Sequence, residues 1–377
     1  MLRIHPRVIG IDIGGANLKL ADTQGNCLAR SFAMWTDFLR LENALAAMFQ
    51  EYCSRFAAIE AVAITLTGEL ADCFESRRHG VCEILWQVQR AAPNVEHFVY
   101  GVNGGWLSTD QAIENAWAVA ASNWAALANW VCQANPTGCQ PHMIVDIGST
   151  TTDVIPLRMH KIATDAKTDR DRLQRGQLVY TGIHRTPVAA VTNQLMIDGR
   201  RCPLMAERFA TVDDAYLVLG LVAEDSGDCD SADGRSRTVL HAGARLARMI
   251  GEDRETLTDE QLRGMAEQIV DIQARQIADA IEQNAPHSGH AGGAIRILES
   301  GHGTSLFSRA IALASGTLQI ECQSLAQVIG VQASRSAPAL AVAWLLTEAL
   351  RQSNIDVGEA GADKKCASDL SANSNGS

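Results

Sequence analysis

The sequence predicts an α/β protein built around two copies of one strand–turn–strand unit. The first copy runs from Val8 to Lys19 and the second from Met143 to Asp153, and in each an apolar run ends in Asp-Ile-Gly before small or hydroxylated residues. Along the rest of the chain, apolar runs of strand length alternate with segments of helical spacing, which is typical of α/β architecture. A length of 377 residues is sufficient for two domains of ordinary size.

In the first half, the pattern predicts three short strands within residues 8–33, further strands at 60–66 and 96–100, and helices at 39–56 and 113–132. The last of these helices contains Trp117, Trp124 and Trp130, and an aromatic series at that spacing is expected to lie in the core. Asn123, beside Trp124, is harder to explain by packing, because a buried amide needs hydrogen-bond partners.

In the second half, the charged residues 164–174 are expected to form a solvated turn, and residues 211–283 are expected to be mainly helical around an acidic surface loop at 224–237. A strand at 294–300 leads into a glycine turn and a helix. We expect an N-terminal lobe at 1–140 and a C-terminal lobe at 141–353 with a helical insertion at about 205–285. The last helix, 337–351, is expected to pack toward the N-terminal lobe, and the polar residues 354–377 to form a disordered tail.

The composition favours a globular protein, with 47% hydrophobic and 20% charged residues. A net charge of −11 argues against wholesale binding to nucleic acid or to an anionic membrane. We expect a cytoplasmic location, because the chain passes directly into its first strand, the ten cysteines form no Cys-x-x-Cys pair, and no apolar stretch reaches the roughly 20 residues of a membrane span.

The two Asp-Ile-Gly turns are the strongest candidates for a binding site. Backbone N–H groups in such a turn form a concave surface that holds phosphate oxygens, and glycine lets the anion approach closely. The sequence offers the following residues for phosphate binding: Gly14, Gly15, Asn17 and Lys19 in the first unit, and Gly148, Ser149, Thr150, Thr151 and Asp153 in the second. Alternatively, Lys19 lies at a solvated strand edge, and the hydroxylated residues reflect strand propensity.

The paired aspartates, Asp12 and Asp146, suggest a metal. If a pseudo-twofold relates the two units, these carboxylates face each other and hold a hydrated Mg²⁺ that bridges phosphate oxygens. Mg²⁺ would also supply the positive charge that an acidic protein lacks. The alternative is that each aspartate caps its own turn by accepting backbone N–H groups.

Three further segments carry candidate residues. Gly301 and Gly303 form a third glycine turn before a helix, whose N-terminus favours anions. Glu69, Asp72 and Arg77 follow a strand, where active-site loops tend to lie. Arg185, an oxyanion binder, precedes Thr186 and a proline in Tyr180-Thr-Gly-Ile-His-Arg-Thr-Pro187. Each segment also fits an ordinary loop.

With its duplicated unit, the chain resembles the superfamily of actin, sugar kinases and chaperone ATPases. Within it, the chain resembles the hydantoinase A/oxoprolinase-like family found with tetrahydromethanopterin-linked one-carbon transfer genes. The segments that carry this resemblance are Asp12–Lys19, Thr67–Asp72, Ala121–Trp124, Asp146–Asp153, Tyr180–Pro187, Phe209–Asp213, Ala232–Gly234 and Arg245–Arg248.

This resemblance implies a two-lobed actin-like fold and a role in building methanofuran-type one-carbon carriers. Archaeal members resemble an enzyme that joins an aminomethylfuran-methyl diphosphate to the phenol of γ-glutamyltyramine and expels diphosphate. The implied partners are therefore a small-molecule diphosphate and a phenolic amine acceptor, with Mg²⁺ as cofactor. A homodimer is one assembly that the sequence leaves open.

The resemblance also implies roles for the candidate residues. Asp12, Glu69, Asp146 and Arg185 are expected to be catalytic, with Glu69 as the base that takes the phenol proton. The expected substrate-binding residues are Asp72, Arg77, Asn123 and Thr186.

Two other functions remain open at this point. One is an ATP-dependent kinase or hydantoinase-like amide hydrolase, and the other is a nucleotide-binding activator that drives a partner protein. His302 stands in the third glycine turn where the superfamily leads us to expect a small apolar residue. That departure would alter a purine pocket and favours a diphosphate substrate over ATP.

Overall fold

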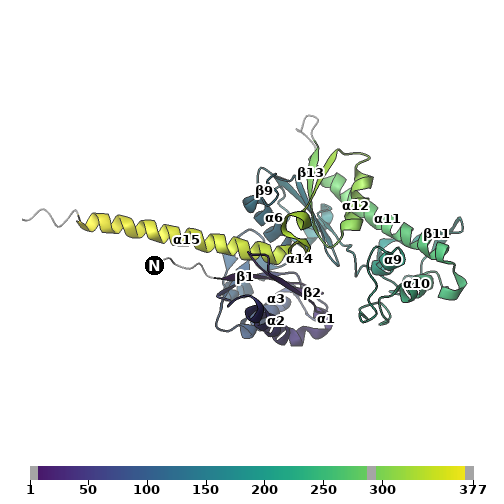
Figure 1. Ribbon diagram of the computed structural model, residues 1–377, viewed down its shortest axis with the longest axis horizontal. Coiled ribbons are helices and arrows are strands. Elements are labelled where there is room, and N and C mark those ends of the chain that lie inside the picture. The colour runs from purple at the N-terminus through teal and green to yellow at the C-terminus, as the bar shows by residue number, and fades with distance from the viewer. Residues whose placement is uncertain (1–6, 287–293, 370–377) are drawn as a thin grey trace, which may run out of the picture. The chain divides into compact units, whose positions relative to one another are not determined.

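The computed structural model describes residues 7–286 and 294–369, and its contacts divide the chain into two compact units (Figure 1). Unit 1 contains Met1–Trp130 and Ser336–Ser377, and unit 2 contains Val131–Arg335. The boundary between the units therefore falls between Trp130 and Val131, within α6 (Asn123–Ala134). The sequence predicts it later, between residues 140 and 141. The last helix, α15 (Ala337–Asp369), groups with the N-terminal residues.

Unit 1 is built on a six-stranded sheet in the order β3-β2-β1-β4-β5-β6. Its strands are β1 (Val8–Ile13), β2 (Asn17–Asp22), β3 (Cys27–Ser31), β4 (Ala61–Leu66), β5 (Glu96–Tyr100) and β6 (Trp106–Leu107). Its helices are α1 (Met34–Asp37), α2 (Leu41–Arg55), α3 (Arg77–Ala91), α4 (Thr109–Glu114), α5 (Ala116–Val119), the start of α6, and α15.

Unit 2 is built on a second sheet in the order β10-β8-β7-β13-β14, with β9 paired to β8. Its strands are β7 (Met143–Ile147), β8 (Thr152–Arg158), β9 (Lys161–Ile162), β10 (Leu178–Val179), β13 (Ile295–Gly301) and β14 (Ile320–Ser324), and β11 (Gln194–Ile197) and β12 (Arg200–Pro203) form a separate hairpin. Its helices are α7 (Asp169–Gln174), α8 (Val188–Val191), α9 (Val212–Val218), α10 (Val239–Arg248), α11 (Asp259–Asn284), α12 (Thr304–Ala314), α13 (Leu325–Ile329) and α14 (Val331–Arg335).

The two sheets repeat one topology. In unit 1, β1 is antiparallel to β2 and parallel to β4, and in unit 2, β7 is antiparallel to β8 and parallel to β13. The register repeats as well, because Asp12 lies opposite Lys19 just as Asp146 lies opposite Asp153. The predicted α/β class and the duplicated actin-like architecture are therefore confirmed.

Burial on both faces explains why β1 is a continuous apolar run. All six of its residues are buried, and α15 covers one face so closely that a Cβ on Gly10 would lie 1.8 Å from the Ala339 carbonyl oxygen. Figure 1 shows α15 in yellow running past β1. Strands covered on both sides lose the alternation of apolar and polar residues that marks a half-exposed strand.

The prediction of a single helix at residues 113–132 is wrong. The structure breaks it into α4, α5 and α6, with Ala121 at a φ of 49°. The break lets the buried hydroxyl of Ser122 share a 2.8 Å hydrogen bond with Thr65 on β4. Trp124 is buried, but Trp117 is 65% exposed, so the tryptophans do not form one core stripe.

The final helix is longer than predicted. The sequence predicts a helix that ends at residue 351 and a disordered tail from 354, but α15 continues to Asp369. After Pro338 no proline interrupts it, and alanine, lysine and acidic residues favour helix enough to carry the chain past two glycines. Residues 370–377 lie outside the described part of the chain.

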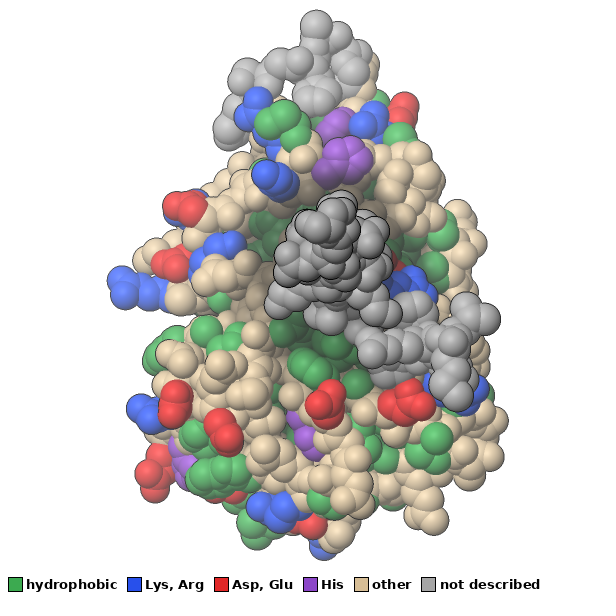
Figure 2. All heavy atoms as spheres, turned by 90° about the vertical axis from the view of Figure 1, so that its left-hand side faces the viewer, with side chains coloured by type: hydrophobic (Ala, Val, Ile, Leu, Met, Phe, Trp, Pro, Cys, Tyr) green, Lys and Arg blue, Asp and Glu red, His purple; other side chains and the backbone are tan. Residues whose placement is uncertain are grey.

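The surface carries a mixture of charges. On the face in Figure 2, acidic and basic side chains of the described residues alternate with apolar ones and do not gather into a single basic patch. Among the described helices, none is both long and apolar enough to span a bilayer.

The contact between Gly10 and α15 can be tested by substitution. Gly10→Ala places a methyl group against the Ala339 backbone, so we expect a loss of about 1–3 kcal/mol in the free energy of unfolding. Gly105→Ala is the control, because a Cβ there meets no atom within 4 Å, and it should change stability by less than about 0.5 kcal/mol. Urea denaturation measures both, and equal stabilities would contradict the packing described here.

Candidate functional site

The first glycine turn connects β1 and β2 in unit 1. The N–H of Gly14 donates to the carbonyl of Asn17 at 2.9 Å, and the N–H groups of Thr67 and Gly68 both donate to the carbonyl of Ile13 at 2.9 Å. A Cβ on Gly68 would lie 2.9 Å from the Gly14 carbonyl oxygen. The loop after β4 is therefore held against the turn, next to the buried Asp12.

The second glycine turn connects β7 and β8 in unit 2 and is closed in the same way. The N–H of Gly148 donates to the carbonyl of Thr151 at 2.9 Å, the bond that Gly14 makes in the first turn. Ser149, Thr150 and Thr151 are only partly buried, and the side chain of Asp146 lies at the end of β7. The two predicted anion-binding turns thus share one backbone geometry.

The third glycine turn lies beside the second. Ser300 and Gly301 on β13 pair with Asp146 and Ile147 on β7, and the N–H of His302 donates to the Ile147 carbonyl at 2.7 Å. Gly301 has a φ of +92°, and a Cβ there would lie 2.9 Å from Asp146 Oδ1. Among the described residues, the buried Ser300 hydroxyl has no hydrogen-bond partner, although Ser300 pairs with Asp146 in the sheet.

Residues 180–187 lie directly on the second turn. The N–H groups of His184 and Arg185 donate to the Ser149 carbonyl at 3.0 Å, and that of Ile183 donates to the Gly148 carbonyl at 3.1 Å. A Cβ on Gly182 would lie 2.5 Å from the same Gly148 oxygen, so only glycine fits there. This segment supports the turn by backbone contact.

Side chains hold residues 180–187 from behind. Thr186 Oγ1 accepts the N–H of Gly182 at 3.0 Å. Gln273 of α11 donates to Thr181 Oγ1 at 2.8 Å and to the Gly182 carbonyl at 2.7 Å. The buried hydroxyl of Thr186 is therefore engaged in the loop itself.

The His184 ring lies against Asp213 of α9. Its Nδ1 is 3.0 Å from Asp213 Oδ1, and Arg237 Nε and Nη2 donate to the same carboxylate at 2.7 and 2.8 Å. Burial opposes ionisation of Asp213, but the hydrogen bonds from His184 and Arg237 outweigh it and lower the pKa of the carboxyl. Asp213 therefore stays ionised.

A chain of ion pairs continues from Arg237. Its Nη1 contacts Asp228 at 3.2 Å, and the fully buried Arg245 contacts Asp214 at 2.7 Å and Asp233 at 3.0 Å. These pairs fix the acidic loop, predicted at residues 224–237, against α9 and α10, which gather beside α11 in Figure 1.

The prediction of a solvated turn at residues 164–174 is wrong. Part of this segment forms α7, and Arg172, only 2% exposed, contacts Asp153 at 2.8 Å. Burial raises the pKa of the Asp153 carboxyl, and Arg172 opposes that shift. Asp153 is thus part of a buried ion pair that joins β8 to α7, which the alternating charges of the sequence concealed.

In unit 1, Glu69 and Arg77 lie close together, and the predicted loop residues differ in exposure. Glu69 is 1% exposed, with Arg77 Nε 3.8 Å from its Oε1, whereas Asp72 is exposed. The Arg77 guanidinium also stacks over the Trp117 ring at 5.2 Å. Asn123 is half-buried at the first position of α6, and Lys19 is half-buried on β2.

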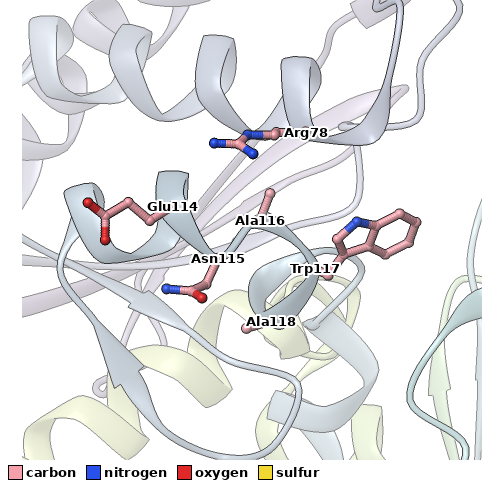
Figure 3. A pocket seen from close by; sticks show the side chains of 6 residues that line it. All are labelled: Arg78, Glu114, Asn115, Ala116, Trp117 and Ala118. Atoms are coloured by element: carbon pink, nitrogen blue, oxygen red, sulfur yellow. The ribbon is translucent and has the colours of Figure 1, made fainter.

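A pocket of about 370 Å³ lies beside the start of α3, next to Arg77. It is lined by Arg78 at the start of α3 and by residues 114–118 of α4 and α5. Figure 3 shows Glu114 and Trp117 directed to opposite sides of the short helices, with Arg78 above them. The exposed Trp117 offers a ring surface at this position.

Metal ligands are sparse in the described part of the chain, where no group of three or more histidine, cysteine or acidic side chains is placed to hold an ion. Asp12 and Asp146 each lie at the end of a strand beside a glycine turn.

Residues 60–349 match the hydantoinase/oxoprolinase family. The chain belongs to this family. It is 32% identical over 346 residues to the (4-{4-[2-(gamma-L-glutamylamino)ethyl]phenoxymethyl}furan-2-yl)methanamine synthase of Methanocaldococcus jannaschii, a match that covers 91% of this chain and 98% of the relative. The synthase of the same name from Methanococcus vannielii is 27% identical over 208 residues, covering 55% of this chain and 91% of the relative.

The family fold is also present in a nucleotide-free acetone carboxylase structure. Its TM-score is 0.51 at 10% identity, with 88% of this chain and 70% of that chain covered. This likeness supports the fold assignment from strand order.

Two features of this family member were not predicted from its sequence: the cluster of paired charged residues and the contact of His184 with α9. Asp213, Asp233 and Arg245 all stand in segments that carry the family resemblance, but no role was predicted for them. His184 lies directly before the predicted residues Arg185 and Thr186, and its partner on α9 is distant in sequence. The recurrence of charged residues in those segments was the available signal.

The Asp213–Arg237 pair should matter to stability in this hydantoinase/oxoprolinase family member. Arg237→Met keeps the apolar stem and removes the charge, so we expect a loss of about 3 kcal/mol in the free energy of unfolding. Because the Asp213 pKa is lowered, the wild-type advantage is present above the ordinary aspartate pKa of about 3.9 and disappears as pH falls through the folded-state value.

Arg263→Met is the matched control. Arg263 is exposed and 3.5 Å from Glu267, so its removal should cost about 0.5 kcal/mol or less. Denaturant titrations from pH 3 to 8, roughly spanning the carboxyl range, check both. Equal losses for the two variants, or a deficit that widens in acid, would contradict the described role of Asp213.

Proposed function

We propose that the protein is a transferase in the synthesis of a methanofuran-type one-carbon carrier. It condenses an aminomethylfuran-methyl diphosphate with a phenolic amine of the tyramine or γ-glutamyltyramine type, forms an aryl ether and releases diphosphate. The observation that carries this proposal is the Methanocaldococcus relative, which matches nearly its whole length to this chain and whose name describes a phenoxymethylfuran product.

The chemistry fits an anion-binding fold. The phenol oxygen forms a bond to the furanylmethyl carbon, the bond from that carbon to the diphosphate oxygen breaks, and the phenol proton is lost. The furan ring stabilises positive charge at the carbon, so the main demand on the protein is to stabilise the departing diphosphate. Preorganised donors meet that demand most effectively.

We assign the leaving group to the glycine turns. The amides and hydroxyls of residues 148–151, the amides of residues 14–17 and the third turn at Gly301 and Gly303 are the proposed donors, with Lys19 and Arg185 supplying positive charge. Support comes from the shared closure of the two hairpin turns and from the buried Ser300 hydroxyl beside the third.

Mg²⁺ is the proposed cofactor, with Asp12 and Asp146 as its protein ligands. Two carboxylates suit Mg²⁺, which commonly completes its shell with phosphate oxygens and water. Bound there, it would neutralise charge on the diphosphate. Glu69 remains the proton acceptor that the sequence proposes, and Asp72, Arg77, Asn123 and Thr186 remain proposed substrate contacts, although the Thr186 hydroxyl already binds the Gly182 backbone.

A diphosphate-release assay tests the function. We expect the wild-type protein to release diphosphate only when the furan diphosphate and a phenolic amine are both present with Mg²⁺. Release of ADP from ATP on addition of an amide or alcohol would instead support a kinase or hydrolase. Stabilisation by ATP without any response to diphosphate would support a nucleotide-binding activator.

The aspartate pair allows a sharper test of the site. Asp146→Asn should lower kcat/KM about 100-fold or more, because it removes charge opposite the leaving group. Asp12→Asn should do the same, and the double variant should lose much less than the product of the two, because both carboxylates act on one metal–diphosphate group. Asp279→Asn, an exposed position on α11, is the control and should keep full activity. Fully multiplicative losses would contradict a shared ligand.

A further inference from the structure

We propose that His184 is the proton acceptor for the phenol and that Asp213 is the positioning residue that holds it. This inference rests on the proposed function and revises one part of it, the role of Glu69. It follows from the contacts of His184 with the second glycine turn on one side and with Asp213 on the other.

The position of His184 is fixed by the backbone of the proposed leaving-group site. Its N–H donates to the carbonyl of Ser149 at 3.0 Å, and the preceding N–H of Ile183 donates to the carbonyl of Gly148 at 3.1 Å. The backbone of His184 is therefore hydrogen-bonded to Ser149, which is one of the proposed diphosphate donors. A base that serves the attacking oxygen needs to lie near the bond that breaks.

The orientation of the ring is fixed by Asp213. An ionised carboxylate only accepts hydrogen bonds, so the imidazole nitrogen 3.0 Å from Asp213 Oδ1, Nδ1, carries the proton. The neutral ring then has a bare Nε2, which is the form that accepts a proton. The ring is 38% exposed although its partner is only 6% exposed, so Nδ1 is held by a rigid group while part of the ring remains open.

The charges around Asp213 argue that its contact with His184 is more than a structural ion pair. Arg237 already binds both oxygens of Asp213, and it also contacts Asp228. Asp213 thus has a permanent cation without His184. The buried pairs of Arg245 with Asp214 and Asp233 hold the same helix and loop in place. The Asp213 carboxylate is therefore held in position independently of the His184 ring.

Glu69 is less suited to this role. Its carboxylate is only 1% exposed and Arg77 Nε lies 3.8 Å from its Oε1, so little of the group is open to a phenol.

The proposed step is balanced. The phenol O–H bond breaks and its proton moves to Nε2 of His184 while the phenol oxygen bonds to the furanylmethyl carbon. The electrons of the broken carbon–oxygen bond leave with the diphosphate. The imidazolium then returns its proton to water.

The test compares phenols of different acidity. His184→Asn keeps a side-chain N–H near the position of Nδ1 and removes Nε2, so with tyramine we expect kcat to fall on the order of 100-fold or more. With ring-fluorinated tyramines, which ionise without help at assay pH, the loss should shrink by about 10-fold or more. Asp213→Asn should show the same trend. His184→Gln is the second variant if His184→Asn does not fold.

His160→Asn is the matched control. His160 is exposed in the β8–β9 turn at a φ of 59°, a conformation that asparagine tolerates, and the variant should match wild type with every phenol. Losses for His184→Asn that are equal across the phenols, or a loss with Glu69→Gln that shrinks with phenol acidity, would overturn the assignment to His184. A wild-type protein that releases no diphosphate with any phenol would instead overturn the proposed function.

Discussion

The backbone contact between residues 182–185 and the second glycine turn is the constraint on which the rest of unit 2 depends. Three N–H groups of this segment donate to the carbonyls of Gly148 and Ser149, and Gly182 approaches the turn too closely for any side chain. The contact satisfies the Gly148 and Ser149 carbonyls within the protein. It also places His184 where α9 can hold its ring through Asp213.

In our proposal, backbone groups bind the anion, and side chains stabilise the elements around the turn. Backbone amides of the turns suit an anion whose charge is spread over many oxygens, and they need no titratable group. The ion pairs of Asp213, Asp214 and Asp233 with Arg237, Arg245 and Arg248 join α9, α10 and the loop between them. In our proposal, the glycine turns hold a diphosphate leaving group.

Local patterns in the sequence predicted much of the fold. The duplicated Asp-Ile-Gly unit, the strands at β4, β5 and β13 and the helical segment around α11 each follow from short-range periodicity and glycine placement. The break at Ala121 was not predictable from local pattern, because the hydroxyl that follows it, Ser122, bonds to Thr65, which is distant in sequence. The same holds for Arg172, whose burial depends on Asp153, and for His184, whose partner lies on a separate helix.

The most direct measurement is a crystal structure of the full chain grown with Mg²⁺ and inorganic diphosphate, compared with one grown with Mg²⁺ and a non-hydrolysable ATP analogue. The account predicts ordered diphosphate within hydrogen-bond distance of the amides of residues 148–151, with the metal between it and the carboxylates of Asp12 and Asp146. An ordered ATP analogue with its purine at residues 301–305, and no bound diphosphate in the other crystal, would contradict it.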